Sequence, residues 1–308
     1  MSIVVFGTVF VDIKGHPLGV YVPDGRNAGI IEQVHGGVGR NVAEDIANCE
    51  LRPMFISTVD NTGIGEDVLN KLVRHNVNVD YCLRTQDGMG TWLAIFDHTG
   101  DVVANLSKRP NLSPLVQVLE QHGDEIFAQA DSVVVEIDCD VPLVKKIVEL
   151  CKKHNKTMYV VVSNMAIAMK RRDLLMDSGC IICNQQEAGV LFSEDYMDKT
   201  PEEMVPILAE KIRLAGYQRM VVTMGGAGAV YAELDGEAGT VPANKVEVRD
   251  TTGAGDAFFS GVTIGLTYGK TLEEACRIGT KLAAAAICTM ENVCPRFRPE
   301  ELGLSPKN

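Results

Sequence analysis

Short apolar runs alternate with amphipathic stretches along most of this chain. Runs such as 3–7, 132–137 and 157–162 have the length and the β-branched content of buried strands. Between them, stretches such as 141–154 carry apolar residues at helical spacing. Strands separated by helices pair in parallel, so the pattern predicts an α/β fold, a three-layer α/β/α sandwich around a mostly parallel sheet. Further strands are expected at 54–58, 79–83 and 180–184, and further helices at 65–75, 201–216 and 283–289.

The regular alternation is interrupted in two places. Two extended runs flank the turn 97–100, which is the pattern of a β-hairpin. Extended pieces are also expected on both sides of the turn-rich stretch 23–27. Together these segments predict a small separate sheet, and an ordinary edge hairpin is the alternative. The inserted segments are expected at about 14–35 and 88–108 of a single domain that spans 1–308, with extended pieces at 19–22, 29–34, 90–96 and 101–106.

Composition and charge narrow the class of protein. A chain of 308 residues with 46% hydrophobic residues and 29 glycines suits one large α/β domain. No apolar run approaches the ~18 residues that a membrane span requires, so no membrane partner is expected. The formal charge of −12 argues against a nucleic acid as partner. Nine dispersed cysteines without a leader segment indicate reduced thiols and a cytoplasmic location.

A glycine-rich turn near the C-terminal end carries the main candidate chemistry. Gly253, Ala254 and Gly255 precede a helix-forming apolar run, so their amides are expected to point into one space at a helix N-terminus. Such a place attracts phosphate. Asp256 would repel an anion there unless it takes a proton from an attacking hydroxyl while the amides hold the charge of the transferred group. The alternative is that Asp256 only caps the helix.

The whole stretch 250–261, Asp-Thr-Thr-Gly-Ala-Gly-Asp-Ala-Phe-x-Ser-Gly, resembles the C-terminal signature of the PfkB, or ribokinase-like, family of sugar and nucleoside kinases. A P-loop motif occurs nowhere in the sequence, and Phe258 stands where a dinucleotide fingerprint needs glycine. The resemblance implies the ribokinase-like fold, ATP and Mg²⁺ as cofactors, and transfer of the γ-phosphoryl group to a primary hydroxyl of a nucleoside or sugar. It also implies that Asp256 is the base and that 253–255 form an anion hole.

A second glycine-rich turn, His35–Asn41, looks like the N-terminal sugar-binding signature of the same family. Gly36, Gly37 and Asn41 are then expected to hold substrate hydroxyls together with Asp12. A polyol needs fixed donors and acceptors, and the Asp and Asn side chains supply both kinds. A tight start of the following helix is the alternative. In the family a small β-sheet forms a lid over this site and often joins two subunits, so the resemblance implies a homodimer through the lid.

Two pairs of residues match ion-binding positions of the family. Asn184 and Glu187 follow an expected strand and resemble the motif that positions magnesium and phosphate, usually through water. One carboxylate suffices, because Mg²⁺ prefers few direct carboxylates plus water. A helix-capping Asn184 is the alternative. Asp250 and Thr252 match positions where relatives offer oxygens to K⁺.

The remaining nucleotide contacts are also inferred from the resemblance. Thr223, Gly225 and Gly228 follow another strand, and their counterparts in the family lie near the nucleotide phosphates. The small-residue helix 283–289 has neighbours that help to enclose adenine in the family. Asn292, just beyond it, is included as a candidate nucleotide contact.

Within the family, the stretches 11–15 and 36–44 look most like pseudouridine kinases, so 5′-phosphorylation of pseudouridine is the expected reaction. One departure is Val-Val-Val-Ser at 160–163, where such kinases often show Asp-Pro-Val-Ser. A sugar kinase of the ribokinase or fructokinase type is the alternative. A non-catalytic nucleotide or sugar sensor on the same fold is a rival, against which the intact Asp256 argues, and an NAD-dependent oxidoreductase is a more distant third.

Overall fold

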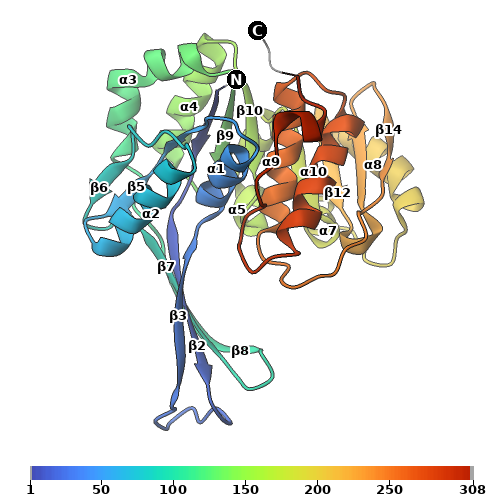
Figure 1. Ribbon diagram of the computed structural model, residues 1–308. Helices are drawn as coiled ribbons and strands as arrows, with labels where there is room; N and C mark the ends of the chain where they lie inside the picture. Colours follow the sequence, from blue (N-terminus) through green and yellow to red (C-terminus); the bar gives the residue numbers. More distant parts are fainter. Residues whose placement is uncertain (1, 306–308) are drawn as a thin grey trace.

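The structure is a computed structural model that describes residues 2–305. Its centre is an eight-stranded sheet with the order β14-β13-β12-β11-β10-β9-β1-β4. Figure 1 shows helices on both faces of this sheet and a long β structure that projects from one side. The strands of the central sheet are β1 (Ile3–Phe6), β4 (Met54–Ile56), β9 (Ser132–Glu136), β10 (Thr157–Val161), β11 (Ile181–Asn184), β12 (Arg219–Thr223), β13 (Ala229–Glu233) and β14 (Ala238–Val241).

Strands β4 to β12 of this order pair in parallel, so the predicted mostly parallel sheet is confirmed. The parallel strands are buried on both faces, because Ile3 and Val5 belong to one apolar core whereas Val4 and Phe6 belong to the other. The last two strands were not expected. β13 and β14 pair antiparallel at one edge, because only the short 3-10 helix η1 (Gly225–Ala227) and a tight turn connect β12, β13 and β14, with no α-helical crossover.

The helices form the two outer layers, which confirms the three-layer sandwich. One core packs beneath α1 (Val38–Asn48), α2 (Gly63–Arg74), α9 (Ala254–Thr267) and α10 (Leu272–Ala286). The other core packs beneath α3 (Leu115–Gln129), α4 (Val141–Lys153), α5 (Met165–Lys170), α6 (Arg172–Met176), α7 (Gln185–Phe192) and α8 (Pro201–Ala215). No helix within residues 2–305 is long and apolar enough to cross a bilayer.

A four-stranded sheet of order β3-β2-β7-β8, called the lid below, projects from the body (Figure 1). Its strands are β2 (Phe10–Pro17), β3 (Gly29–Gly36), β7 (Gly90–Phe96) and β8 (Val102–Lys108). The expected extended piece at 19–22 is wrong, because β2 ends at Pro17 and an exposed turn follows. β2 instead lies between β3 and β7, so both of its edges are paired.

Three other boundaries differ from the sequence pattern. The expected strand 54–58 is divided into β4 and β5 (Thr58–Asp60), and β5 pairs with β6 (Leu83–Thr85) in place of a strand at 79–83. The expected helix 283–289 is only the last turn of α10, which ends at Ala286. The short strands β5 and β6 take their conformation from pairing with each other, a contact that local periodicity does not indicate.

Candidate active site

The two glycine-rich turns, far apart in sequence, meet at the N-termini of α1 and α9. Asn41 Nδ2 donates a hydrogen bond of 2.7 Å to Asp256 Oδ2, across 215 positions of sequence. Gly37 and Gly253 are the N-cap residues of the two helices, with φ angles of 101° and 79°. The structure therefore brings the two predicted motifs into one site.

The turn at Gly253 accepts only glycine. Its φ lies in the left-handed region, and an added Cβ would lie 2.0 Å from the carbonyl oxygen of Asn292. The residues that follow, Ala254 and Gly255, open α9, where the first backbone amides have no partner within the helix. Asp256 is in this first turn but makes no capping hydrogen bond, so the capping alternative does not describe its contacts.

The surroundings of Asp256 shift its pKa toward neutrality. Burial raises its pKa to about 7, and the nearby carboxylate of Glu136 adds to the increase. The hydrogen bond from Asn41 and the positive charge of Arg40 act in the opposite direction and lower the pKa. A base with a pKa near neutrality can accept a proton and release it again at physiological pH.

Asp12 lies against Gly36 of the N-terminal turn. An added Cβ on Gly36 would lie 2.7 Å from Asp12 Oδ2, and one on Gly37 would lie 2.4 Å from the carbonyl oxygen of Thr8. Burial raises the pKa of Asp12. Asn41 Oδ1 is buried and has no hydrogen-bond partner among the described residues. The site thus offers a carboxylate and a free amide oxygen as acceptors for hydroxyl groups.

Sequence reasoning missed Glu136, which ends strand β9 and is 2% exposed. Its carboxylate accepts hydrogen bonds from the amides of Thr8 (2.7 Å) and Gly39 (3.1 Å). Burial raises its pKa. A glutamate at the end of an otherwise apolar run, 132–137, was the available signal, because a buried carboxylate needs a specific reason to be there.

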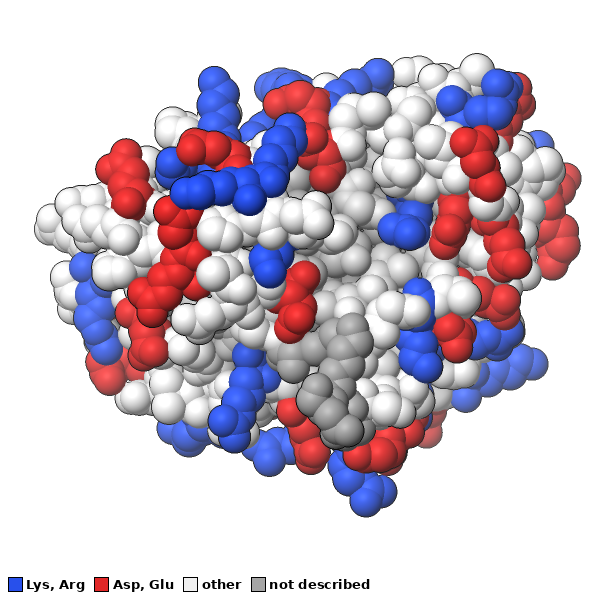
Figure 2. Space-filling model, turned by 90° about the horizontal axis from the view of Figure 1, so that it is seen from above, with Lys and Arg blue, Asp and Glu red and all other residues white. Residues whose placement is uncertain are grey.

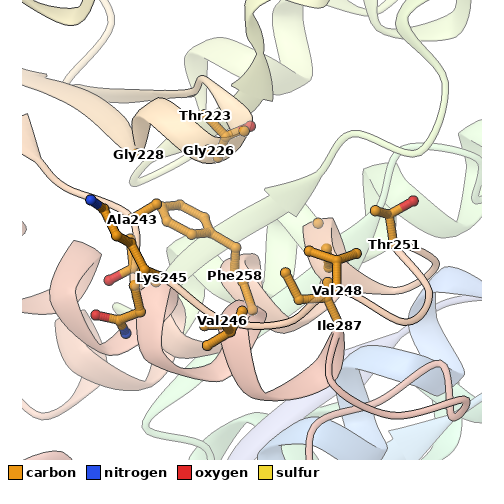
Figure 3. Close-up of a pocket in the computed structure, with 17 residues that line it drawn as sticks. Thr223, Gly226, Gly228, Ala243, Lys245, Val246, Val248, Thr251, Phe258 and Ile287 are labelled. Carbon is orange, nitrogen blue, oxygen red and sulfur yellow. The ribbon is translucent and has the colours of Figure 1, made fainter.

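A cavity of about 490 Å³ lies on the other side of the α9 N-terminus. Figure 3 shows Thr223 and Gly226 on one side of it and Phe258 and Val246 on the other. An apolar wall next to glycine backbone suits a flat heterocycle followed by phosphates. The cavity is lined by Thr223, Gly225, Gly226, Gly228, Ala243, Asn244, Lys245, Val246, Val248, Thr251, Ala254, Gly255, Phe258, Thr280, Ala283, Ala284 and Ile287.

The predicted nucleotide contacts are thus only partly brought together. Thr223, Gly225 and Gly228 line the cavity, as do Ala254 and Gly255, two of the residues predicted to form the anion hole. Asn292 is not among the lining residues, and its Nδ2 lies 3.4 Å from the carbonyl oxygen of His35 at the base of the lid. The apolar wall formed by 246–248 could not be predicted from the sequence, because that segment has no regular secondary structure and hence no periodic pattern.

Asn184 and Glu187 form a reciprocal capping box at the start of α7. Asn184 Oδ1 accepts from the Glu187 amide, and Glu187 Oε2 accepts from the Asn184 amide, both at 2.8 Å. These contacts agree with the alternative expectation that Asn184 caps the helix. The pair is also next to the cavity described above, because Asn184 is the register partner of Thr223, which lines it. Glu187 keeps its second oxygen for a water of a hydrated Mg²⁺, so the residues fit that ion.

Asp250 and Thr252 contact each other. Asp250 Oδ1 accepts from the amide (2.9 Å) and the hydroxyl (2.8 Å) of Thr252. These hydrogen bonds lower the pKa of Asp250, so its carboxylate is ionised near neutral pH. The geometry fixes the exposed loop that leads into the anion hole.

Known proteins resemble this chain over nearly its full length. Residues 1–293 match the family described as pfkB family carbohydrate kinase. The chain is 37% identical over 293 residues to a guanosine-inosine kinase of Exiguobacterium acetylicum, covering 94% of this chain and 96% of the relative. It is 27% identical over 288 residues to a pseudouridine kinase of Escherichia coli, covering 92% and 90%.

A solved structure has the same fold as this chain. The ribokinase of Arabidopsis thaliana, crystallised with ribose and ATP, superposes with a TM-score of 0.85 and covers 97% of each chain. Because the two sequences are only 19% identical, this likeness concerns the fold alone. It confirms the ribokinase-like fold expected from the sequence.

Proposed function

The chain belongs to the pfkB family of carbohydrate kinases and is a phosphotransferase with an alcohol acceptor, and from this we propose that it phosphorylates the 5′-hydroxyl of a purine ribonucleoside such as guanosine or inosine, with ATP as donor. The relative with guanosine-inosine kinase activity in its name is 37% identical, compared with 27% for the pseudouridine kinase. Pseudouridine, expected from the motifs at 11–15 and 36–44, is the second candidate.

One observation favours a nucleoside over a free sugar. Trp92 of β7 is the register partner of Asp12 on β2, so both side chains lie on the same face of the lid. Phe96 stands edge-on to Trp92 at 6.4 Å between ring centroids, and His16 stacks on Phe96 at 4.7 Å. If Asp12 holds the ribose hydroxyls, this aromatic strip is where a base attached to the ribose would lie. A free pentose would leave it uncovered.

The reaction follows from the arrangement of the two motifs. Asp256 accepts the proton of the 5′-hydroxyl as its oxygen forms a bond to the γ-phosphorus, the bond to the bridging oxygen breaks, and ADP leaves. The amides of 253–255 hold the charge that develops on the phosphoryl oxygens. Adenine is assigned to the apolar wall of the cavity and Mg²⁺, which screens the phosphates when bound, to Glu187 through water.

We also propose that Asp250 and Thr252 bind K⁺. The support is an ionised carboxylate in the loop that leads into the anion hole, where a bound cation would strengthen attraction for phosphate. We expect turnover to be faster in potassium chloride than in tetramethylammonium chloride at equal ionic strength. Equal rates in the two salts would contradict this assignment.

The proposal also includes the oligomeric state and the cellular location of the enzyme. We propose a homodimer through the lid, because Leu18, Val20, Ile31 and Leu106 there are 71–75% exposed. We also propose a cytoplasmic location, supported by nine cysteines that all lie in the described part of the chain and are all unpaired.

An acceptor panel tests the proposed function. ADP release is measured with guanosine, inosine, pseudouridine, uridine, ribose and fructose at equal concentration. Guanosine or inosine should give the highest kcat/KM, and the 2′-deoxy analogue should lose ~10-fold or more, because the Asp12 carboxylate would lose a partner. A preference for ribose or fructose over every nucleoside would overturn the nucleoside assignment.

The aromatic strip is tested separately in the same assay. Trp92→Ala should raise KM for the preferred nucleoside ~10-fold, since base stacking on an aromatic side chain contributes about 1–3 kcal/mol. Trp92→Phe, which keeps an aromatic face, serves as the matched control and should stay near the wild type. An unchanged KM in Trp92→Ala would show that the base lies elsewhere.

A further inference from the structure

The face of the lid that carries Asp12 and Trp92, called the inner face below, also carries a lysine. This residue, Lys14, has no role in the proposed reaction so far. Side chains along a strand alternate between faces, so Lys14 lies on the same face as Asp12, two positions further along β2. Its register partners are Ala94 on β7 and Glu32 on β3. Lys14 is half-buried, whereas the turn beyond β2 is exposed.

The charge of Lys14 affects carboxylates in both parts of the site, Asp12 on the lid and Asp250 in the loop before Gly253. Burial raises the pKa of Asp12, and the ammonium group of Lys14 opposes this rise. The hydrogen bonds from Thr252 lower the pKa of Asp250, three positions before Gly253, and the charge of Lys14 adds a smaller effect in the same direction. Such through-space effects require proximity, because solvent screens distant charges. Lys14 is therefore near the Asp250 loop as well as on the same face of the lid as Asp12.

Lys14 is also free to bind a ligand. Among residues 2–305, no carboxylate oxygen lies within 4.0 Å of its ammonium nitrogen. Arg40, the cation that acts on Asp256, already pairs with Glu44 and donates to the carbonyl oxygen of His35, both at 2.5 Å. Because Asp12, Glu136 and Asp256 are all acidic, an unpaired cation beside them would offset their repulsion of an incoming phosphoryl group.

We propose that Lys14 binds the phosphoryl group as it passes from ATP to the acceptor, which makes it a catalytic residue contributed by the lid. This inference rests on the proposed function and adds a residue to it. The ammonium contacts the non-bridging oxygens on the side opposite to the amides of 253–255. After transfer it still contacts the phosphate of the product, so it distinguishes a 5′-monophosphate from the unphosphorylated acceptor.

The test compares binding of product and acceptor. The best acceptor of the panel and its phosphate are titrated into wild type, Lys14→Ala and Lys108→Ala, and the fluorescence of Trp92, the single tryptophan of the chain, is followed. Lys108 is the matched control, because it lies on β8 as the partner of Thr91 and hence on the outer face of the lid. Isothermal calorimetry repeats each titration independently of the fluorophore.

Lys14→Ala should weaken binding of the phosphate product ~10-fold or more and leave binding of the acceptor within about two-fold, because only the product carries an anion for the ammonium group to bind. kcat should fall by at least the same factor, Lys14→Arg should recover part of it, and Lys108→Ala should match the wild type. Equal loss for product and acceptor, or no loss for the product, would overturn the inference. The panel on the wild type decides the proposed function separately, because the pair of ligands is chosen from its result.

Discussion

Asp256 shows how one side chain acquires its chemistry from its position. It is in the first turn of α9, where unpaired amides favour an anion, yet burial and Glu136 raise its pKa to about 7. Asn41 donates to one carboxylate oxygen and leaves the other for a substrate hydroxyl. The residue is therefore half protonated near neutral pH, and only its ionised form can accept a proton.

We expect kcat/KM to rise with pH and to level off above about 7, the pKa of Asp256. Asp256→Asn should lower turnover ~10²-fold or more with acceptor binding nearly unchanged, because the amide cannot accept the proton. Asp235→Asn, at an exposed turn between β13 and β14, is the control. Near-normal turnover in Asp256→Asn would refute the assignment of the base.

The same residue links stability to pH. Its pKa is higher in the folded than in the unfolded state, so the neutral carboxyl group stabilises the fold. This contribution is complete at a pH below 3.8, the pKa in the unfolded state, and is lost as the pH rises through about 7. Asp256→Asn imitates the neutral form. The difference in Tm between variant and wild type should therefore be more positive at pH 8 than at pH 5, and thermal denaturation at the two values measures it.

At the scale of elements, a buried charge network fixes the lid to the body. Arg40 of α1, which is 2% exposed, donates to the carbonyl oxygen of His35 at the end of β3 and pairs with Glu44 one turn later. Lys71 of α2 lies 3.1 Å from the other oxygen of Glu44. Asn292 also donates to the His35 carbonyl, so the base of the lid is held from the loop behind Gly253 as well.

Removing Arg40 should destabilise the protein strongly. Arg40→Met leaves the Glu44 carboxylate buried with only Lys71 and, more distantly, His75 as partners, and we expect a loss of ~3–5 kcal/mol in the free energy of unfolding by urea. The double variant Arg40→Met/Glu44→Leu should recover part of this loss. Lys146→Met, which breaks an exposed pair with Glu149, should cost ~1 kcal/mol or less. Equal losses in the single Arg40 variant and the double variant would contradict the network.

At the scale of the whole molecule, the two ends differ in surface chemistry. Figure 2, seen from the side opposite to the lid tip, shows acidic and basic side chains interspersed. The lid has an apolar outer face instead, where Ile13, Ile31, Leu93 and Ile95 line a cavity of about 470 Å³. Burying such a face against a second copy would stabilise both subunits by the hydrophobic effect.

The dimer is tested by placing a charge on that face. Ile31, which is 74% exposed on β3, is changed to Lys, and Val190→Lys at a site on α7 that is 48% exposed is the control. Sedimentation equilibrium should show a dimer for wild type and control and a monomer for Ile31→Lys. A monomeric wild type at micromolar concentration would exclude the proposed assembly.

The sequence by itself determined the features that rest on local residue pattern. Apolar β-branched runs such as 132–137 predicted buried parallel strands, because only a sheet covered on both faces tolerates them. Capping residues such as Thr200 predicted where α8 begins, through hydrogen bonds within a few residues. The glycine turn before Asp256 predicted an anion hole, because glycine permits the backbone angles that the turn needs.

Tertiary structure alone decided which groups meet. The hydrogen bond between Asn41 and Asp256 depends on the packing of α1 against α9, and the raised pKa of Asp256 depends on burial and on Glu136 from β9. The apolar wall near Val246 forms only when an irregular segment packs over α9. Such contacts join residues distant in the sequence, and their energies depend on dielectric surroundings and distances that exist only after the chain has folded.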